Sequence, residues 1–241
     1  MISVSCPAFS FTPLDETLEI VEKEFGAMEI VAEAKHGAWN IERESFNIAI
    51  SIHAPFNDIN LASLKEEHRL FSLREIKRII EVASKKNIDV VTIHPGWPSP
   101  LSMLDEEGVK ERAARSIRDL DKEADNLGIT LCVENMPIKN FFSDVSELGT
   151  VAENICLDVG HANITGTLDG FLKDSKKIGN LHLHENCGEL DEHLPLTGDH
   201  IDIKNIISHL RDYRGFMVIE ARSIEEALRS RDFLKNIKNV L

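Results

Sequence analysis

Several histidines and carboxylates in this chain of 241 residues stand where short apolar runs end. The residues that close such runs are His53, His94, Glu134, Asp158 and Glu220. Imidazole nitrogens and carboxylate oxygens are the donor set that suits Zn²⁺, with Mn²⁺ or Fe²⁺ as alternatives. The pattern therefore predicts a divalent metal site, provided that the fold brings the run ends together.

Histidines are concentrated around these run ends. Of the ten histidines, seven lie on a run end or in the segment that follows one: His53, His94, His161, His182, His184, His193 and His200. Asp191 shares a segment with His193. A lone histidine in an apolar run is usually a hydrogen-bonded core residue. A cluster that also holds carboxylates would repel itself and lose hydration unless cations neutralised it, so we expect bound metal ions.

Eight runs have the composition of strands, at residues 2–6, 27–31, 48–53, 90–94, 130–134, 155–158, 180–184 and 216–220. Most are continuously apolar, which is typical of parallel strands buried on both faces. Amphipathic stretches separate the runs, for example at 64–86 and 109–127. Ser63, Asp105 and Asp202 are expected to cap helices at their N-termini.

This alternation predicts an α/β fold, a single (β/α)₈ TIM barrel in which residues 1–241 form one domain. The length is close to the roughly 250 residues of such barrels. An open doubly wound sheet has the same alternation, but Cys6-Pro7-Ala8-Phe9 follows the first run in place of a glycine-rich phosphate loop. A closed barrel gathers the C-terminal strand ends at one rim, where such barrels carry their active sites.

The composition restricts the partners. The formal net charge is −14, from 41 Asp and Glu against 27 Lys and Arg. An acidic surface disfavours unspecific attraction to nucleic acid, although a local basic site can coexist with it. No apolar run approaches the roughly 20 residues of a membrane span, and the N-terminal residues lack a basic signal segment. We expect a cytoplasmic protein that does not contact membranes.

The four cysteines are Cys6, Cys132, Cys156 and Cys187. They are far apart, without the CxxC spacing of zinc or redox motifs, and three of them lie in apolar runs. Buried thiols are therefore expected rather than disulfides or a thiolate metal site.

Several local motifs resemble the endonuclease IV family, also called AP endonuclease family 2, within the xylose isomerase-like TIM barrel superfamily. The most specific motif is the string from Ser51 to Leu61, which contains His53-Ala54-Pro55 and Ile59-Asn60-Leu61. The others are His94-Pro95-Gly96, Glu134-Asn135, Leu157-Asp158-Val159-Gly160-His161, His182-Leu183-His184-Glu185 and Asp191-Glu192-His193. The resemblance extends over nearly the whole chain.

The resemblance implies two or three Zn²⁺ ions and hydrolysis of a phosphodiester at abasic sites in DNA. The implied ligand sets are His53, His94 and Glu134 for one ion, Glu134, Asp158, His182 and Glu220 for a second, and His161, Asp191 and His193 for a third. Glu134 would bridge two of the ions, and Glu134 and Glu220 are the expected catalytic residues.

Some positions depart from that family. Phe56 replaces the usual tyrosine, Met136 and Pro137 replace the usual threonine and glycine after Asn135, and the chain is short for an endonuclease IV. The string from Leu194 to Asp202 looks more like sugar isomerase relatives. The alternative function is therefore a sugar or sugar-phosphate isomerase or epimerase. It would use one Mn²⁺ or Mg²⁺ ion, and Glu134 and Glu220 would move a proton between adjacent carbons.

Other polar residues near the expected rim have weaker assignments. His184, Glu185 and His200 are interpreted as partners that orient ligand imidazoles. Glu29 and Glu33 lie near the end of the second run and are either rim residues or solvated charges. We leave these two outside the predicted site.

Overall fold

The computed structural model describes residues 1–238 and shows a closed parallel barrel, which confirms the predicted (β/α)₈ fold. Its strands pair in chain order, and β1 closes the barrel against β8. Their bounds are β1 Ile2–Ser5, β2 Ala27–Val31, β3 Ala49–His53, β4 Val90–Ile93, β5 Thr130–Glu134, β6 Asn154–Asp158, β7 Ile178–Leu183 and β8 Met217–Glu220. Each observed strand overlaps one of the predicted runs.

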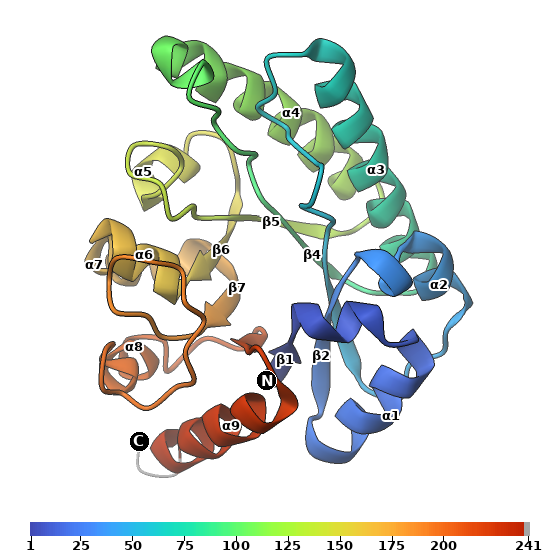
Figure 1. The fold of residues 1–241 in the computed structure, drawn as a ribbon, viewed down its shortest axis with the longest axis vertical. Helices are drawn as coiled ribbons and strands as arrows, with labels where there is room; N and C mark the ends of the chain where they lie inside the picture. The colour runs from blue at the N-terminus through green and yellow to red at the C-terminus, as the bar shows by residue number, and fades with distance from the viewer. Residues whose placement is uncertain (239–241) are drawn as a thin grey trace.

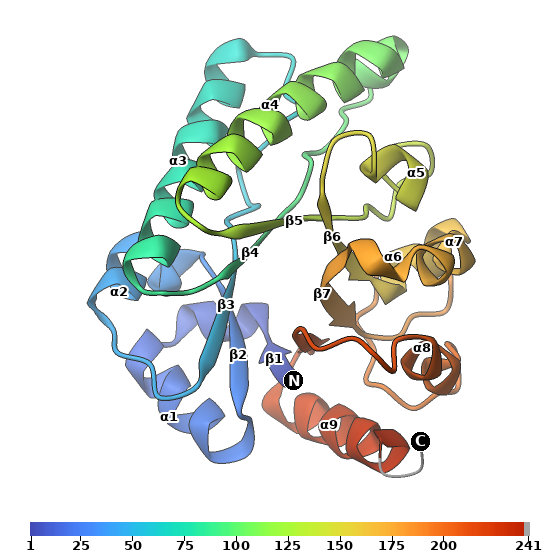
Figure 2. The ribbon, with the colours of Figure 1, turned by 180° about the vertical axis from the view of Figure 1, so that it is seen from behind.

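Helices surround the strands (Figures 1 and 2). The α-helices are α1 Leu14–Glu24, α2 Ala38–Arg43, α3 Glu66–Lys85, α4 Glu106–Asn126, α5 Val145–Leu148, α6 Val159–Thr165, α7 Leu168–Lys173, α8 Ile203–His209 and α9 Ile224–Lys238. Short 3₁₀ helices occur at η1 Pro7–Phe11, η2 Ala34–His36, η3 Ser102–Asp105 and η4 Ser175–Lys177. The long helices α3 and α4 lie side by side on one flank (Figure 1), whereas the helices that follow β5, β6 and β7 are short.

Two of the three predicted helix caps are observed. Asp105 accepts a hydrogen bond from the backbone N–H of Gly108 at the start of α4, and Asp202 accepts one from Asn205 at the start of α8. The prediction for Ser63 was wrong, because α3 begins at Glu66 and its N-cap is Lys65, whose backbone angles are extended. The Ser63 hydroxyl instead accepts from the Lys65 N–H, in a turn before the helix.

The apolar core fills the space between the barrel and its helices, but part of the barrel interior is polar. Glu29, Ser51, Thr92 and Asn180 are all fully buried. Asn180 Nδ2 donates to Glu29 Oε2 at 2.7 Å and to Thr92 Oγ1 at 2.8 Å, and Ser51 Oγ donates to Glu29 Oε2 at 2.9 Å. Since alternate residues of a strand face the same side, Ser51, Thr92 and Asn180 form a layer directly below the residues two positions later in their strands.

Cys6, Cys132 and Cys156 are buried, as the sequence predicts, whereas Cys187 is exposed in the segment after β7. Within residues 1–238, no helix is both long enough and apolar enough to cross a membrane.

Tyr213, the single tyrosine, closes the N-terminal end of the barrel. Its hydroxyl donates to the carbonyl oxygens of Phe216 and Gly179, at 2.8 and 3.2 Å, just before β8 and at the start of β7. Tyr213→Phe is expected to lower the free energy of unfolding by about 1 kcal/mol, the usual worth of a lost hydrogen bond. Urea denaturation measures this. An unchanged free energy of unfolding would contradict the structural role of the Tyr213 hydroxyl. The number of metal ions that the protein binds should be the same in the variant, because the catalytic rim of such barrels is at the opposite end.

Candidate metal centre

The structure brings all nine residues of the predicted ligand sets to the C-terminal end of the barrel. His53, Glu134, Asp158 and Glu220 are the last residues of their strands, and His94 directly follows β4. The remaining four come from nearby elements: His182 from β7, His161 from α6, and Asp191 and His193 from the segment between β7 and α8. Each of the nine residues has a nitrogen or oxygen atom within ion-pair distance of another of the nine. Glu29 also lies within this distance of His182, and His184 within this distance of Asp158.

Glu134 is at the centre of the cluster and is 2% exposed. Four imidazole nitrogens surround its carboxylate: His53 Nε2 at 3.1 Å, His94 Nε2 at 3.3 Å, His161 Nδ1 at 3.4 Å and His182 Nδ1 at 3.5 Å. One donor atom each from His53, His94 and Glu134 fit within 4.8 Å of one another, which is compact enough to hold one ion. This group coincides with the first predicted ligand set.

A second group forms on the β6, β7 and β8 side. Donor atoms of Asp158, His182 and Glu220 also lie within 4.8 Å of one another. His182 Nδ1 lies 3.3 Å from Glu220 Oε1 and 3.5 Å from Glu134 Oε2. The two predicted catalytic glutamates therefore approach the same nitrogen from β8 and β5.

A third group lies at the outer side of the cluster. Asp191 Oδ2 is 3.2 Å from His161 Nε2 and 3.2 Å from His193 Nε2. These are the residues of the third predicted set. Asp191 and His193 are partly exposed, so this group borders solvent.

His184 belongs to this third group more closely than the sequence suggested. It is fully buried, and its Nε2 lies 3.2 Å from Asp158 Oδ1 and 3.5 Å from Asp191 Oδ1. Its ring stacks on His193 with centroids 4.0 Å apart. Donor atoms of Asp158, His161 and His184 form a further compact group. The signal in the sequence is the spacing of His182 and His184, because residues two apart on a strand face the same side.

Glu185 and His200 do not contact a ligand imidazole in the way that was expected. Glu185 accepts backbone hydrogen bonds from Thr197, Gly198 and His200, and its own backbone pairs with that of Leu194. It therefore fixes the fold of the segment that carries Asp191 and His193. The His200 imidazole points to the Cys187 thiol, with Nδ1 and Sγ 3.9 Å apart.

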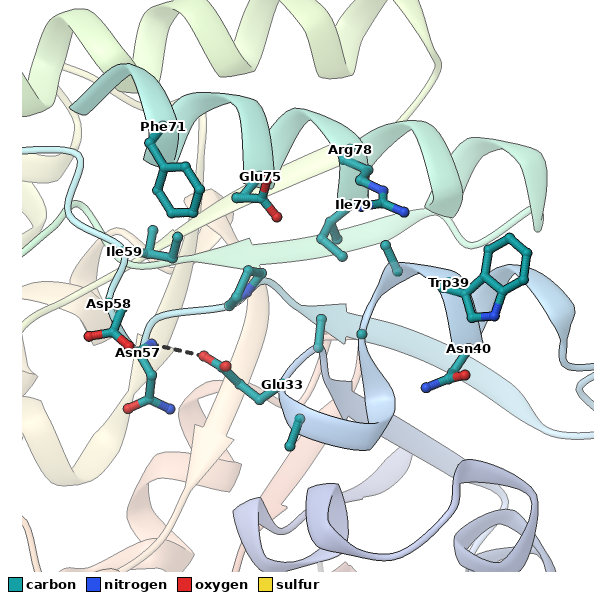
Figure 3. A pocket seen from close by; sticks show the side chains of 15 residues that line it. Glu33, Trp39, Asn40, Asn57, Asp58, Ile59, Phe71, Glu75, Arg78 and Ile79 are labelled. Carbon is teal, nitrogen blue, oxygen red and sulfur yellow. Dashed lines mark hydrogen bonds between the residues drawn. The ribbon is translucent and has the colours of Figure 1, made fainter. Parts of the chain in front are cut away.

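Glu33 is held by the backbone rather than solvated. Its Oε1 accepts from the N–H groups of Phe56 and Asn57, both at 2.8 Å. Figure 3 shows Glu33 and Asn57 lining a cavity of about 390 Å³ between the segments after β2 and β3 and helix α3. The Phe56 ring instead packs on His53 and His94, with centroids 5.2 and 5.3 Å away. This cavity is therefore a neighbour of the histidine cluster and not part of it.

The two glutamates of the centre differ in their acidity. Burial raises the pKa of Glu134, but His182 and His94 outweigh burial and hold that pKa well below its usual range. At Glu220, burial dominates over the favourable charge of His182, so the pKa is raised. In the metal-free protein, Glu134 is thus the stronger acid of the two.

Several nitrogen and oxygen atoms inside the cluster have no hydrogen-bond partner and could bind a cation. Among the described residues, Asp158 Oδ2, His94 Nδ1, His182 Nδ1 and His184 Nε2 are buried without a hydrogen-bond partner. A buried polar atom without a partner costs free energy. Because several of these atoms belong to compact groups of nitrogen and oxygen donors, the residues suit divalent ions such as Zn²⁺, Mn²⁺ or Mg²⁺. The donor set does not by itself select one of these metals.

Known proteins share the barrel and most of its length. A profile of the xylose isomerase-like TIM barrel family matches residues 29–237. The chain belongs to this family. The match confirms the superfamily that the motifs resembled. It does not distinguish hydrolysis at abasic sites from other activities of the superfamily.

Several relatives carry names that refer to sugar epimerases. An uncharacterized protein of Methanocaldococcus jannaschii, MJ1614, is 30% identical over 235 residues, which are 93% of each chain. The crystal structure of a D-tagatose 3-epimerase-like protein superposes with a TM-score of 0.90 at 27% identity, covering 99% of this chain and 97% of that one. A D-psicose 3-epimerase of Enterocloster bolteae is 30% identical over 138 residues, 52% of this chain and 44% of the relative. These matches favour the sugar alternative over the DNA function.

Gly160, at the start of α6, leaves the space that His184 occupies. A Cβ added at Gly160 would lie 2.0 Å from His184 Cε1. Gly160→Ala is therefore expected to displace the imidazole and to weaken zinc binding about tenfold or more. Competition with a chromophoric chelator measures the affinity. Gly170→Ala is the matched control, because its Cβ would make only an ordinary contact 3.6 Å from Val145. Wild-type affinity in Gly160→Ala would show that His184 does not contribute to the centre.

The metal-free protein is expected to lose stability between pH 6.5 and about pH 10. Burial opposes the charged forms of His161 and His193, but neighbouring carboxylates, Asp158 and Asp191 foremost, raise their pKa values from the ordinary 6.5 to about 10 and about 9. Both imidazoliums therefore stabilise the fold fully below pH 6.5, and this contribution disappears as the pH rises through the folded pKa values.

Thermal unfolding of chelator-treated protein across this pH range measures the effect. His161→Asn should flatten the decline in melting temperature, whereas His209→Asn on the exposed side of α8 should leave it as in the wild type. A melting temperature that is constant or rises between pH 6.5 and 10 would contradict the assignment.

Proposed function

We propose that this protein is a divalent-metal-dependent isomerase or epimerase that acts on a small sugar or sugar phosphate. The observation that carries the proposal is the position of Glu134 and Glu220, which approach His182 Nδ1 from two different strands to 3.5 and 3.3 Å. Donor atoms of Asp158, His182 and Glu220 lie within 4.8 Å of one another, and Glu134 completes a set of four residues through its approach to His182 Nδ1. The similarity to a D-tagatose 3-epimerase-like structure and to a D-psicose 3-epimerase supports the same class of reaction.

The chemistry of such a reaction needs two proton-transfer groups. One carboxylate removes the proton from a carbon next to a carbonyl group, and a second group returns a proton to the opposite face or to the neighbouring carbon. Glu134, which is buried, and Glu220, which is 13% exposed, are carboxyl groups of different acidity, which suits one as base and the other as acid. A metal ion held by Glu134, Asp158, His182 and Glu220 would polarise the carbonyl and hydroxyl oxygens of the sugar.

Aromatic rings border the centre on its β3 and β4 side. The Phe56 ring lies against His53 and His94, and Trp97 packs edge-on against His94 with centroids 5.7 Å apart. Apolar rings of this kind cover one face of a small substrate and exclude water from the reacting carbons. The formal net charge of −14 also suits a small substrate better than a polyanion.

A second candidate function is hydrolysis of a phosphodiester at abasic sites in DNA. It is favoured by one specific observation, the presence of the His53, His94 and Glu134 group and of the His161, Asp191 and His193 group beside the four-residue set. A one-metal isomerase has no evident use for these residues as ligands. Two or three Zn²⁺ ions would occupy the groups in that case, and together they would stabilise the charge on a phosphodiester.

Proton transfer at a sugar carbon can be measured without knowing the preferred epimer. We expect the protein, loaded with Mn²⁺, Mg²⁺ or Zn²⁺ in D₂O, to exchange deuterium into a ketose at the carbon next to the carbonyl group. NMR detects this exchange in D-tagatose, D-psicose and D-fructose. Glu134→Gln and Glu220→Gln should each slow the exchange by about 100-fold or more, because each removes a proton-transfer group.

Glu75→Gln is the matched control, because Glu75 lines the separate cavity of Figure 3 and should not affect the exchange. Loss of exchange in this control would place the active site in that cavity instead. Nicking of an abasic-site oligonucleotide by zinc-loaded protein, with no exchange in any ketose or ketose phosphate, would transfer the conclusion to the second candidate.

A further inference from the structure

A buried glutamate lies directly beneath the metal centre and is outside every predicted ligand set. Glu29, in the middle of β2, has no exposed surface. Its Oε1 lies 2.8 Å from Nε2 of His182, the nitrogen on the far side of the ring from Glu134 and Glu220. This is the distance of a charge-assisted hydrogen bond.

The second carboxylate oxygen of Glu29 has different partners. Oε2 accepts from Ser51 Oγ at 2.9 Å and from Asn180 Nδ2 at 2.7 Å. The other amide proton of Asn180 goes to Thr92 Oγ1 at 2.8 Å. Asn180 Nδ2 is also 3.3 Å from His182 Nε2, but Glu29 and Thr92 already take both of its protons. Glu29 Oε1 has no hydrogen-bond partner among the described residues and lies 2.8 Å from His182 Nε2, so it is the acceptor available to a proton on that nitrogen.

The protonation pattern of His182 follows from this contact. A neutral imidazole carries one proton, and a carboxylate that accepts at Nε2 keeps the proton on that nitrogen. The lone pair is then on Nδ1, which faces Glu134 and Glu220 and has no hydrogen-bond partner among the residues that the structure describes. A nitrogen lone pair between two carboxylates is a favourable arrangement only with a cation beside it.

We propose that Glu29 is a positioning residue, which holds His182 in the tautomer with the proton on Nε2 and so presents Nδ1 to the metal ion. The inference rests on the proposed function only in that His182 is a metal ligand, and it holds equally for the second candidate function. If Glu29 had only a structural role, it would need only to accept the hydrogen bonds from Ser51 and Asn180. A neutral amide oxygen at the same place would satisfy both.

Glu29→Gln separates these two roles. Because Ser51 and Asn180 both donate, the amide oxygen of glutamine takes the Oε2 position and its NH₂ group faces His182. His182 Nε2 must then accept a hydrogen bond, and the imidazole proton moves to Nδ1, where it blocks the metal. The packing and the hydrogen bonds to Ser51 and Asn180 remain.

The test combines metal affinity with an NMR signature of the histidine. We expect Glu29→Gln to bind Zn²⁺ about 10- to 100-fold more weakly than the wild type. The matched control is Glu147→Gln, the same chemical change at a carboxylate whose partners are Lys110 and the Ser143 backbone. This control should bind Zn²⁺ as the wild type does.

Zinc-loaded wild type should show a slowly exchanging Nε2–H proton on His182 in ¹H–¹⁵N spectra and a zinc-dependent shift of Nδ1. A proton on Nδ1 in the wild type, which requires no variant to fold, would overturn the proposal. So would wild-type zinc affinity in a folded Glu29→Gln. Weakened zinc binding in Glu29→Gln without ketose exchange in the wild type would leave the positioning role in place and reject the isomerase function.

Discussion

The carboxylate of Glu134 is held almost entirely out of water and is surrounded by four imidazole nitrogens. A buried charge of this kind costs several kcal/mol unless it is paired and hydrogen-bonded. Three further carboxylates, Asp158, Asp191 and Glu220, come within reach of the same imidazoles. The C-terminal end of the barrel is therefore organised around closely spaced carboxylates, whose negative charge is offset by protons on the neighbouring imidazoles and would be offset further by bound cations.

The layer of side chains below the histidine and carboxylate cluster is also polar. Glu29, Ser51, Thr92 and Asn180 replace the apolar residues that usually fill a barrel of this size. Hydrogen bonds join Ser51, Thr92 and Asn180 to one another through Glu29 Oε2 and the Asn180 amide, and the other oxygen of Glu29 faces His182 Nε2 at 2.8 Å. A network of this kind fixes one arrangement of the residues above it, because any other arrangement leaves a buried polar atom without a partner.

The residue types of the histidine and carboxylate cluster are compatible with both a sugar and a DNA substrate. All nine residues implied by the endonuclease IV resemblance are present and close together, so the ligand types alone do not separate the two functions. A structure with the same barrel is named D-tagatose 3-epimerase-like, and a relative by sequence is named D-psicose 3-epimerase. The segment held by Glu185, from Leu194 to His200, is the part of the sequence that looked most like sugar isomerases.

The sequence by itself determined the barrel and the residues of its rim. Continuous apolar runs specify buried parallel strands, and a run that ends in His53, Glu134, Asp158 or Glu220 places that side chain at the C-terminal rim of any closed (β/α)₈ barrel. The apolar periodicity of α3 and α4 likewise fixed two helices to within a few residues. The start of α3 at Glu66 was missed because serine is a preferred N-cap residue and lysine is not, so only the path of the backbone shows that Lys65 is the N-cap.

Only the tertiary structure decided the roles of Glu29, Glu33 and His184. The sequence places both glutamates near the end of β2, but whether such a side chain enters the barrel or faces a neighbouring segment depends on the direction of the strand and on what pairs with it. His184 reaches the centre because Gly160, on a different element, leaves room for its ring. Local patterns thus fix which residues lie at the rim, whereas contacts between residues that are distant in the sequence decide which of them face the same point in space.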